Sequence, residues 1–205
     1  MQQALGLLHV YRQKRISFYQ WRTQAGFWQL LALAGALAAL TGLLAQVRIY
    51  LPWTPIPIVA SQLGVILAAV LLGKRWGAAS MGLYALGGLL GIPWFAGWNG
   101  GLAALAGPTG GYILGYILAA LFMGHILDSK PGTRRLLPLS MVILFAQLVL
   151  LYIPGLIHFY LWLNLAGSQV TLLNLLWLGY IPFIAGDVVK SLVGALIARS
   201  VSPMD

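Results

Sequence analysis

The sequence has 205 residues, of which 60% are hydrophobic and only 7% are charged. Soluble domains carry about 25% charged residues, so this composition excludes a water-facing surface and indicates an integral membrane protein. The net charge of +9 comes from basic residues that lie between apolar runs, which favours membrane topology over nucleic-acid binding as its cause. The absence of cysteine excludes disulfides and thiolate metal sites.

Residues 1–26 are too charged to cross a membrane and too apolar to stay free in water. Arg12, Lys14, Arg15 and Arg22 are interspersed with aliphatic and aromatic side chains. We expect a basic amphipathic helix that lies on the anionic, cytoplasmic face of the membrane. A disordered basic tail is the alternative. A cleaved signal peptide is not expected, because the charges extend too far and the next apolar run is long enough to span.

Residues 27–200 are predicted to form one all-α membrane domain that contains six apolar stretches. Residues 201–205 form a short tail after it. At about 20 residues per span plus loops, the length suits about six spans. We predict spanning helices at residues 27–46, 58–73, 78–90, 110–127, 136–152 and 178–198. Pro52, Pro55 and Pro57 exclude a helix from the 47–57 loop. Residues 153–177 are predicted as an uncharged aromatic loop region, with a half-helix around 156–165 as an option.

Small residues crowd the first predicted span. Ala32 with Ala36, and Ala34 with Ala38, each form a small-x-x-x-small pair. Such spacing puts a smooth stripe on one helix face and allows another helix to approach closely. The stripe serves either internal packing or the docking of a partner, and the sequence leaves both open.

Residues 91–112 form a loop rich in glycine, proline and large aromatic residues, without charge. Glycine lets the backbone approach a ligand, proline fixes turns, and aromatic rings offer flat apolar walls. The alternative is an interfacial anchor, where Trp is common. The sequence therefore predicts either a ligand-binding loop or a membrane-surface loop.

Basic residues are distributed very unevenly over the two predicted sides of the membrane. Under the six-span arrangement, ten of the twelve lie on the side of the termini, and only Arg48 lies on the other side, with Lys190 inside a span. The positive-inside rule places both termini in the cytoplasm. The 47–57, 91–112 and 153–177 loops then lie together on the outer face, as the cover of a ligand site.

Asp187 and Lys190 are the ionisable residues placed clearly inside a predicted span. Their i, i+3 spacing puts both on one face of the last helix. Charges at that depth are costly, so they generally face a cavity or the bundle interior. We favour contact with a polar small molecule over a self-neutralising pair that pins the helix.

Uncharged polar and aromatic residues could complete such a site. Amide side chains both donate and accept hydrogen bonds, although they also bridge helices. Aromatic residues could form pocket walls, although each is more often a packing residue. The candidates are Gln62, Tyr84, Phe95, Trp98, Asn99 and Tyr112.

Several chemistries have no basis in the sequence. It contains no Walker loop and no His, Asp and Glu cluster with metal-ligand spacing, and three acidic residues leave little for acid–base catalysis. We therefore predict no catalytic residue, no metal and no cofactor. An intramembrane enzyme is disfavoured, and a purely structural membrane subunit is the remaining rival.

The order of the motifs resembles the BioY family, the biotin-binding S-components of energy-coupling factor (ECF) transporters. The resemblance rests on Gln62, Leu-Gly-Lys-Arg at 72–75, Tyr84, Gly-Ile-Pro at 91–93, Phe-Ala-Gly at 95–97, Gly100-Gly101, Gly-Pro-Thr-Gly-Gly-Tyr at 107–112 and Gly-Asp-x-x-Lys at 186–190. It covers roughly residues 27–200. The basic leader and the Trp98-Asn99 pair depart from the family pattern.

The resemblance implies six transmembrane helices in the plasma membrane and biotin bound near the outer face. Gln62, Tyr84, Asn99, Asp187 and Lys190 are the implied ligand-facing residues. It also implies docking, through an Ala-x-x-x-Ala motif on the first helix, to a transmembrane coupling protein that carries two ATPase subunits. The expected function is high-affinity biotin uptake, with an S-component for another vitamin such as riboflavin or thiamine as the alternative.

Overall fold

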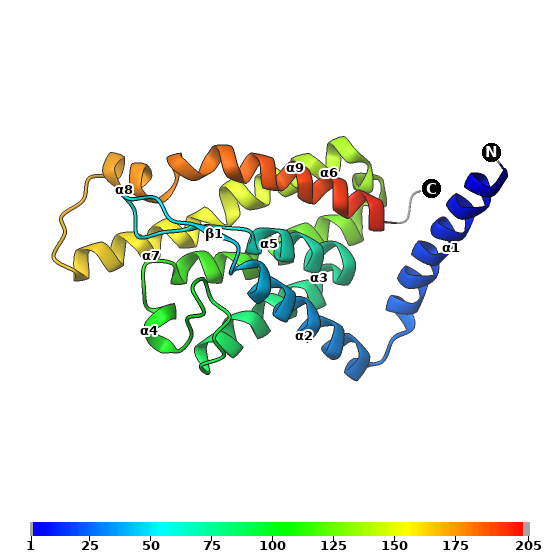
Figure 1. The fold of residues 1–205 in the computed structure, drawn as a ribbon, viewed down its shortest axis with the longest axis horizontal. Helices are drawn as coiled ribbons and strands as arrows, with labels where there is room; N and C mark the ends of the chain where they lie inside the picture. The colour runs from blue at the N-terminus through cyan, green and yellow to red at the C-terminus, as the bar shows by residue number, and fades with distance from the viewer. Residues whose placement is uncertain (1, 203–205) are drawn as a thin grey trace.

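Long apolar helices run roughly side by side through the computed structural model, which describes residues 2–202 (Figure 1). They are joined by short helices and by one two-stranded ribbon. The helices are α1 (Gln2–Gln24), α2 (Phe27–Leu44), α3 (Ser61–Leu89), α4 (Leu102–Leu105), α5 (Gly110–Ser129), α6 (Leu136–Phe145), α7 (Tyr152–Leu165), α8 (Leu172–Gly179) and α9 (Ile184–Val201). The 3-10 helices η1 (Pro131–Arg134) and η3 (Ile181–Phe183), the π-helix η2 (Ala146–Leu150) and the strands β1 (Arg48–Ile49) and β2 (Ile58–Val59) complete the fold.

Within residues 2–202, five helical stretches are long and apolar enough to cross a membrane: Phe27–Leu44, Ser61–Leu89, Gly110–Ser129, Leu136–Leu165 and Leu172–Val201. The all-α membrane fold is therefore confirmed. The difference from the predicted number lies in α3, which joins the two stretches predicted at 58–73 and 78–90.

Helix α3 is interrupted at Gly73, whose backbone angles (φ 74°, ψ −164°) are not helical. A Cβ added to Gly77 would lie 2.9 Å from the carbonyl oxygen of Ala68. In a continuous helix these two residues would be about 13 Å apart, so the chain must reverse direction between them. The two halves of α3 therefore pack against each other as an antiparallel pair.

The prediction of a loop over residues 153–177 was wrong for most of that range, although the optional half-helix around 156–165 is present as part of α7. Helix α7 continues from the preceding helix to Leu165, α8 begins at Leu172, and only residues 166–171 connect them. Pro154 is tolerated inside this continuous helical stretch because local π-helical adjustments can satisfy the backbone groups that a proline leaves unbonded, and the Leu151 N–H bonds to the Ala146 carbonyl at 3.0 Å. The π-helical turn η2 just before it adjusts the backbone at the junction.

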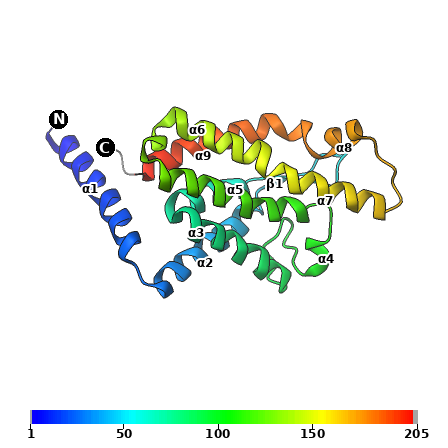
Figure 2. The ribbon, with the colours of Figure 1, turned by 180° about the vertical axis from the view of Figure 1, so that it is seen from behind.

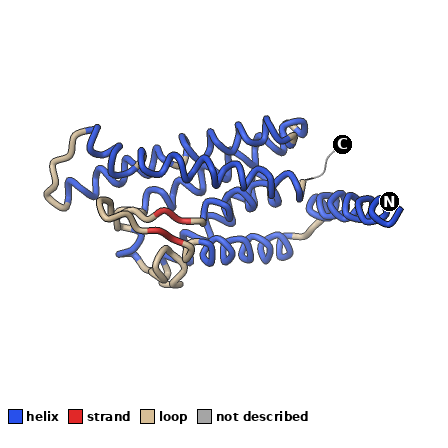
Figure 3. Tube along the Cα trace, turned by 45° about the horizontal axis from the view of Figure 1, so that its top comes forward, coloured by secondary structure: helices blue, strands red, loops and turns tan. Residues whose placement is uncertain are grey.

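The loops after α2 and α3 are ordered and tied to each other. Strands β1 and β2 pair antiparallel, with Arg48 opposite Val59, and lie side by side in Figure 3. Gln46 connects this ribbon to the 91–101 segment, because its amide nitrogen donates to the Phe95 carbonyl (3.1 Å) and its amide oxygen accepts from the Trp98 N–H (2.9 Å). The two loops therefore form one cover over an end of the bundle.

Helix α1 stands apart from the other helices in both Figure 1 and Figure 2, beside the described end of α9. The expected helix in the basic segment is therefore present. Side chains hold it to the bundle: the Tyr11 hydroxyl donates to the Ser200 carbonyl (2.7 Å) and the Tyr19 hydroxyl to the Val70 carbonyl (2.9 Å). Its place on a membrane face stays a prediction.

Candidate ligand-binding site

A cavity lies beneath the cover formed by the two loops. Its walls come from α3, α5, α7, α9 and both loops, and they include Ile56, Val59, Gln62, Ala96, Thr109 and Asp187. Its free volume is about 60 Å³, which holds a few water molecules. Ligand pockets usually have about 300–1,000 Å³, so this cavity is contracted.

Asp187 is the centre of the polar contacts in this cavity, and it is 1% exposed. Its Oδ2 accepts from the Gln62 amide at 3.0 Å and from the Tyr152 hydroxyl at 2.5 Å. Its Oδ1 lies 2.6 Å from the Lys190 ammonium nitrogen. These partners come from α3, α7 and α9, so one carboxylate connects three helices that are distant in the sequence. A charge buried in this way requires such compensation.

Lys190 connects the carboxylate to the loop cover. Its Nζ donates to the Val59 carbonyl at 3.0 Å, and Val59 belongs to β2. Any movement of the ribbon therefore changes the surroundings of the Lys190 ammonium. The side chain is 16% exposed, and so a small part of it is accessible.

One buried acceptor near this centre, Gln147 Oε1, has no hydrogen-bond donor among the residues that the structure describes. Asp187 Oδ1 has a single partner, the Lys190 ammonium at 2.6 Å. Gln147 is 1% exposed and its amide nitrogen donates to the Gln62 carbonyl at 3.4 Å. Buried acceptors without donors are costly, so the site is prepared for a ligand N–H or for water.

Tyrosine side chains form much of the remaining wall. The Tyr116 hydroxyl lies 2.6 Å from the Ser61 hydroxyl, and the Tyr112 hydroxyl donates to the Gly179 carbonyl at 2.9 Å. The Tyr84 and Tyr116 rings lie 6.1 Å apart between centroids, within the range of aromatic pairs. Because the hydroxyls are engaged in hydrogen bonds, these side chains contribute mainly apolar ring surface to the cavity wall.

The structure brings five of the predicted site residues to this cavity and leaves three away from it. Gln62, Tyr84, Tyr112, Asp187 and Lys190 line it. Phe95 is buried and packs on the Tyr84 ring, with centroids 5.3 Å apart, behind the wall. Trp98 is 61% exposed, and the Asn99 amide donates to the Ala96 carbonyl within its own loop.

Tyr152, Tyr116 and Ser61 line the cavity and were not predicted from the sequence. Tyr152 carries a polar hydroxyl in an otherwise apolar stretch, and a buried Tyr hydroxyl normally has a partner. The hydroxyl of Tyr152 was therefore the feature of the sequence that could have indicated a site residue. Because residues 153–177 were assigned to a loop, Tyr152 was placed at the end of a span and was not expected to point into the bundle.

Comparison with known proteins places this chain in a family. The BioY family model matches residues 14–204. The chain belongs to the BioY family. A probable biotin transporter BioY of Methanothermobacter thermautotrophicus is 40% identical over 140 residues, which cover 68% of this chain and 89% of that one. The biotin transporter BioY of Rhizobium etli is 33% identical over 177 residues, covering 84% and 90%.

A solved structure shares the fold of this BioY-family chain. It is a crystal structure of the S-component for biotin from an ECF-type ABC transporter, and it superposes with a TM-score of 0.69 at 28% sequence identity. The match covers 83% of this chain and 89% of that one. The resemblance found in the sequence is thus confirmed, and the chain is a multi-pass membrane protein.

Proposed function

We propose that this protein is the biotin-binding S-component of an ATP-driven ECF transporter and that it has no catalytic activity of its own. The observation that carries the proposal is the buried Asp187 carboxylate with Lys190, Gln62 and Tyr152 around it. These residues lie in a covered cavity of a chain whose relatives are named biotin transporters.

The polar centre of the cavity matches a polar end of biotin, and its tyrosine walls match the apolar parts. A ureido ring presents N–H donors and a carbonyl acceptor, and the acid chain ends in a carboxylate. Asp187 Oδ1, whose single described partner is the Lys190 ammonium at 2.6 Å, accepts from a ureido N–H. Lys190 offers positive charge or a hydrogen bond to a ligand oxygen, and the tyrosine rings contact the apolar thiophane and valeryl parts.

Biotin entry requires the cover to move outward, because the cavity of about 60 Å³ is too small for it. The ribbon is the element best able to move. Its contacts to α9 and α8 are few: the Lys190 ammonium holds the Val59 carbonyl, and the Thr54 hydroxyl donates to the Leu178 carbonyl at 2.7 Å. If a ligand oxygen accepts a hydrogen bond from the Lys190 ammonium, the bond from Lys190 to the Val59 carbonyl is released.

We place six crossings in the plasma membrane, with both termini in the cytoplasm. The reversal of α3 at Gly73 supports counting its halves as two crossings. The positive-inside rule then supports a cytoplasmic end with Lys74, Arg75 and Lys130 and an outer end with the cavity cover.

Docking to a transmembrane coupling protein with two ATPase subunits belongs to the same proposal. Ala34 and Ala38 are 0% exposed inside the bundle, whereas Ala32 and Ala36 are exposed. A Cβ added to Gly35 would meet no atom within 4 Å. The Ala32/Ala36 pair is therefore the small-residue stripe open to a partner helix.

Calorimetric titration of the detergent-purified protein with biotin, riboflavin and thiamine tests the function. We expect saturable one-to-one binding of biotin only. The variant Asp187→Leu/Lys190→Leu removes both charges together, so that no unpaired charge is buried. It should stay folded, with some loss of thermal stability because the Gln62 amide and the Tyr152 hydroxyl lose their acceptor, and it should lose biotin binding.

Ser191→Ala is the matched control on α9, because Ser191 is buried next to Lys190 without lining the cavity. It should bind biotin normally. A folded double-leucine variant that binds biotin unchanged would show that the pair only pins the helix. Binding of riboflavin or thiamine instead of biotin would support the alternative vitamin.

A further inference from the structure

A second hollow lies at the end of the bundle opposite the loop cover. It is found where α1 ends, α3 reverses and α5 ends, and its volume is about 420 Å³. Its lining includes Arg22, Leu30, Lys74, Arg75, Trp76 and His125. The 62–73 half of α3 separates it from the ligand cavity by about 16 Å, so the two sites are distinct.

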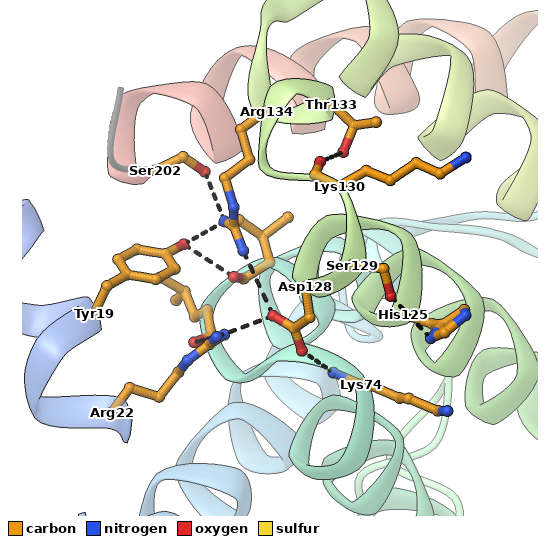
Figure 4. Close-up of polar contacts among 12 residues, drawn as sticks. Tyr19, Arg22, Lys74, His125, Asp128, Ser129, Lys130, Thr133, Arg134 and Ser202 are labelled. Carbon is orange, nitrogen blue, oxygen red and sulfur yellow. Dashed lines mark hydrogen bonds and ion pairs between the residues drawn. The ribbon is translucent and has the colours of Figure 1, made fainter. Parts of the chain in front are cut away.

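Asp128 is the single carboxylate in the lining of this hollow, and its oxygens are already engaged (Figure 4). Oδ1 accepts from Arg22 Nη2 at 2.9 Å and lies 3.7 Å from Arg134 Nη2. Oδ2 accepts from the backbone N–H of Lys74 at 2.8 Å. Asp128 therefore offsets one of the two positive charges on Arg22 and Arg134 and holds the α3 reversal, and it leaves the side-chain charges of Lys74 and Arg75 uncompensated.

Lys74 and Arg75 are these uncompensated cations. Both side chains are exposed. Among the described residues, none accepts a hydrogen bond from the Lys74 ammonium or the Arg75 guanidinium, and none forms an ion pair with either group. Figure 4 shows the Lys74 side chain extending away from Asp128 while its backbone N–H points to it. Two positive charges at the rim of a hollow favour an anionic ligand.

Aromatic residues at the same level mark the boundary of the bilayer. Phe27 and Trp28 are 61% and 77% exposed, and the Phe27 ring lies 5.4 Å from that of Trp76, which lines the hollow. Exposed tryptophans concentrate at the headgroup level of membranes. Leu30 and Leu72 also line the hollow but are only 9% and 4% exposed, so the apolar surface open to lipid comes from Phe27, Trp28 and Trp76. The hollow thus combines cations at the water side with apolar surface at the lipid side.

We propose that this hollow binds the phosphate headgroup of an anionic phospholipid, with Lys74 and Arg75 as its charged ligands and Trp76 and Phe27 against the first part of the acyl chains. A basic pocket between membrane helices on the cytoplasmic side suits such a headgroup. The apolar part of the lining distinguishes a lipid from free phosphate, which would gain nothing from it. The bound lipid adds a link between α2 and α3 at the level where Asp128 and the Tyr19–Val70 hydrogen bond hold α1 to the bundle.

Native mass spectrometry of the full-length protein tests the proposal, after purification with phosphatidylglycerol or phosphatidylcholine in equal amounts. We expect one phosphatidylglycerol molecule to be retained in preference to phosphatidylcholine. Each basic residue near an anionic headgroup contributes about fivefold, so Lys74→Gln/Arg75→Gln should reduce this retention about 30-fold. The change affects exposed side chains, and unchanged circular dichroism and gel-filtration profiles verify folding.

Lys130→Gln/Arg135→Gln is the matched control, because it removes the same charge from exposed residues on the same end but outside the hollow. It should retain the lipid as the wild type does. Equal losses in both double variants would overturn the proposal in favour of a general charge effect. Equal retention of phosphatidylcholine, or equal thermal stabilisation by inorganic phosphate, would also overturn it.

Discussion

Gly73 is the residue on which the reversal of α3 depends. Its backbone lies in a region (φ 74°, ψ −164°) that is open almost only to glycine. A Cβ there would also come within 2.2 Å of Asp128 Oδ2. We predict that Gly73→Ala lowers the free energy of unfolding by about 2–4 kcal/mol, from backbone strain and the displaced carboxylate. Thermal unfolding in detergent measures this loss.

The matched control for this prediction is Gly82→Ala in the same helix, where an added Cβ meets no atom within 4 Å. It should leave the protein as stable or slightly more stable, because alanine favours helix. Equal melting temperatures for the two variants would contradict the role given to Gly73.

Tyr152 is the residue that holds Asp187 in place within the ligand cavity. Its hydroxyl donates to Asp187 Oδ2 at 2.5 Å, and hydrogen bonds to charged groups contribute about 1.5–3 kcal/mol. If the carboxylate must be held to receive a ureido N–H, Tyr152→Phe should weaken biotin binding by about 10- to 100-fold. Calorimetric titration checks the change.

Tyr180→Phe is the control for Tyr152→Phe. The Tyr180 ring contacts the Tyr152 ring, with centroids 4.6 Å apart, and no described residue forms a hydrogen bond with its hydroxyl. The biotin affinity of the Tyr180→Phe variant should equal that of the wild type. A normal affinity in the Tyr152 variant would mean that Asp187 does not need this donor.

At the scale of elements, Gln46 links the 47–60 loop to the 91–101 loop, so that the two form one cover over the cavity. Its amide bonds to the backbone of residues 42, 94, 95 and 98. We predict that Gln46→Ala accelerates amide hydrogen exchange in residues 47–60 and 91–101, because the freed backbone groups open locally. Asn164→Ala, which removes an exposed amide bonded only within α7, should leave exchange in both segments unchanged.

The elements of the site differ in how far the sequence reveals them. Asp187, Lys190 and Gln62 could be predicted because polar groups in apolar stretches must find partners or a cavity. Asn99 and Trp98 could not be excluded, because turn geometry decides where a loop side chain points: Trp98 has φ 57° and lies outside. The extension of α7 past Pro154 depends on the π-helical turn before it, and hydrophobic periodicity does not encode that turn.

At the scale of the whole molecule, the surface of α2 decides how the protein assembles. Ala36 is exposed, whereas Ala34 is buried and its carbonyl accepts from the Ser80 hydroxyl at 2.8 Å. We predict that Ala36→Leu leaves folding and biotin binding unchanged but prevents copurification with the coupling protein and ATPases. A bulky side chain there separates two helices that associate through small residues.

Two comparison variants make the assembly prediction specific. Ala34→Leu should reduce thermal stability itself, by about 1–3 kcal/mol or more, because the interior of the bundle has no space for the larger side chain. Ala103→Leu, which enlarges an exposed alanine on α4, should copurify with the partners as the wild type does. If Ala36→Leu copurifies normally and transports biotin, the docking stripe lies elsewhere on the molecule. Loss of assembly with retained biotin binding would place partner docking on α2 and separate it from the ligand cavity, which no α2 residue lines.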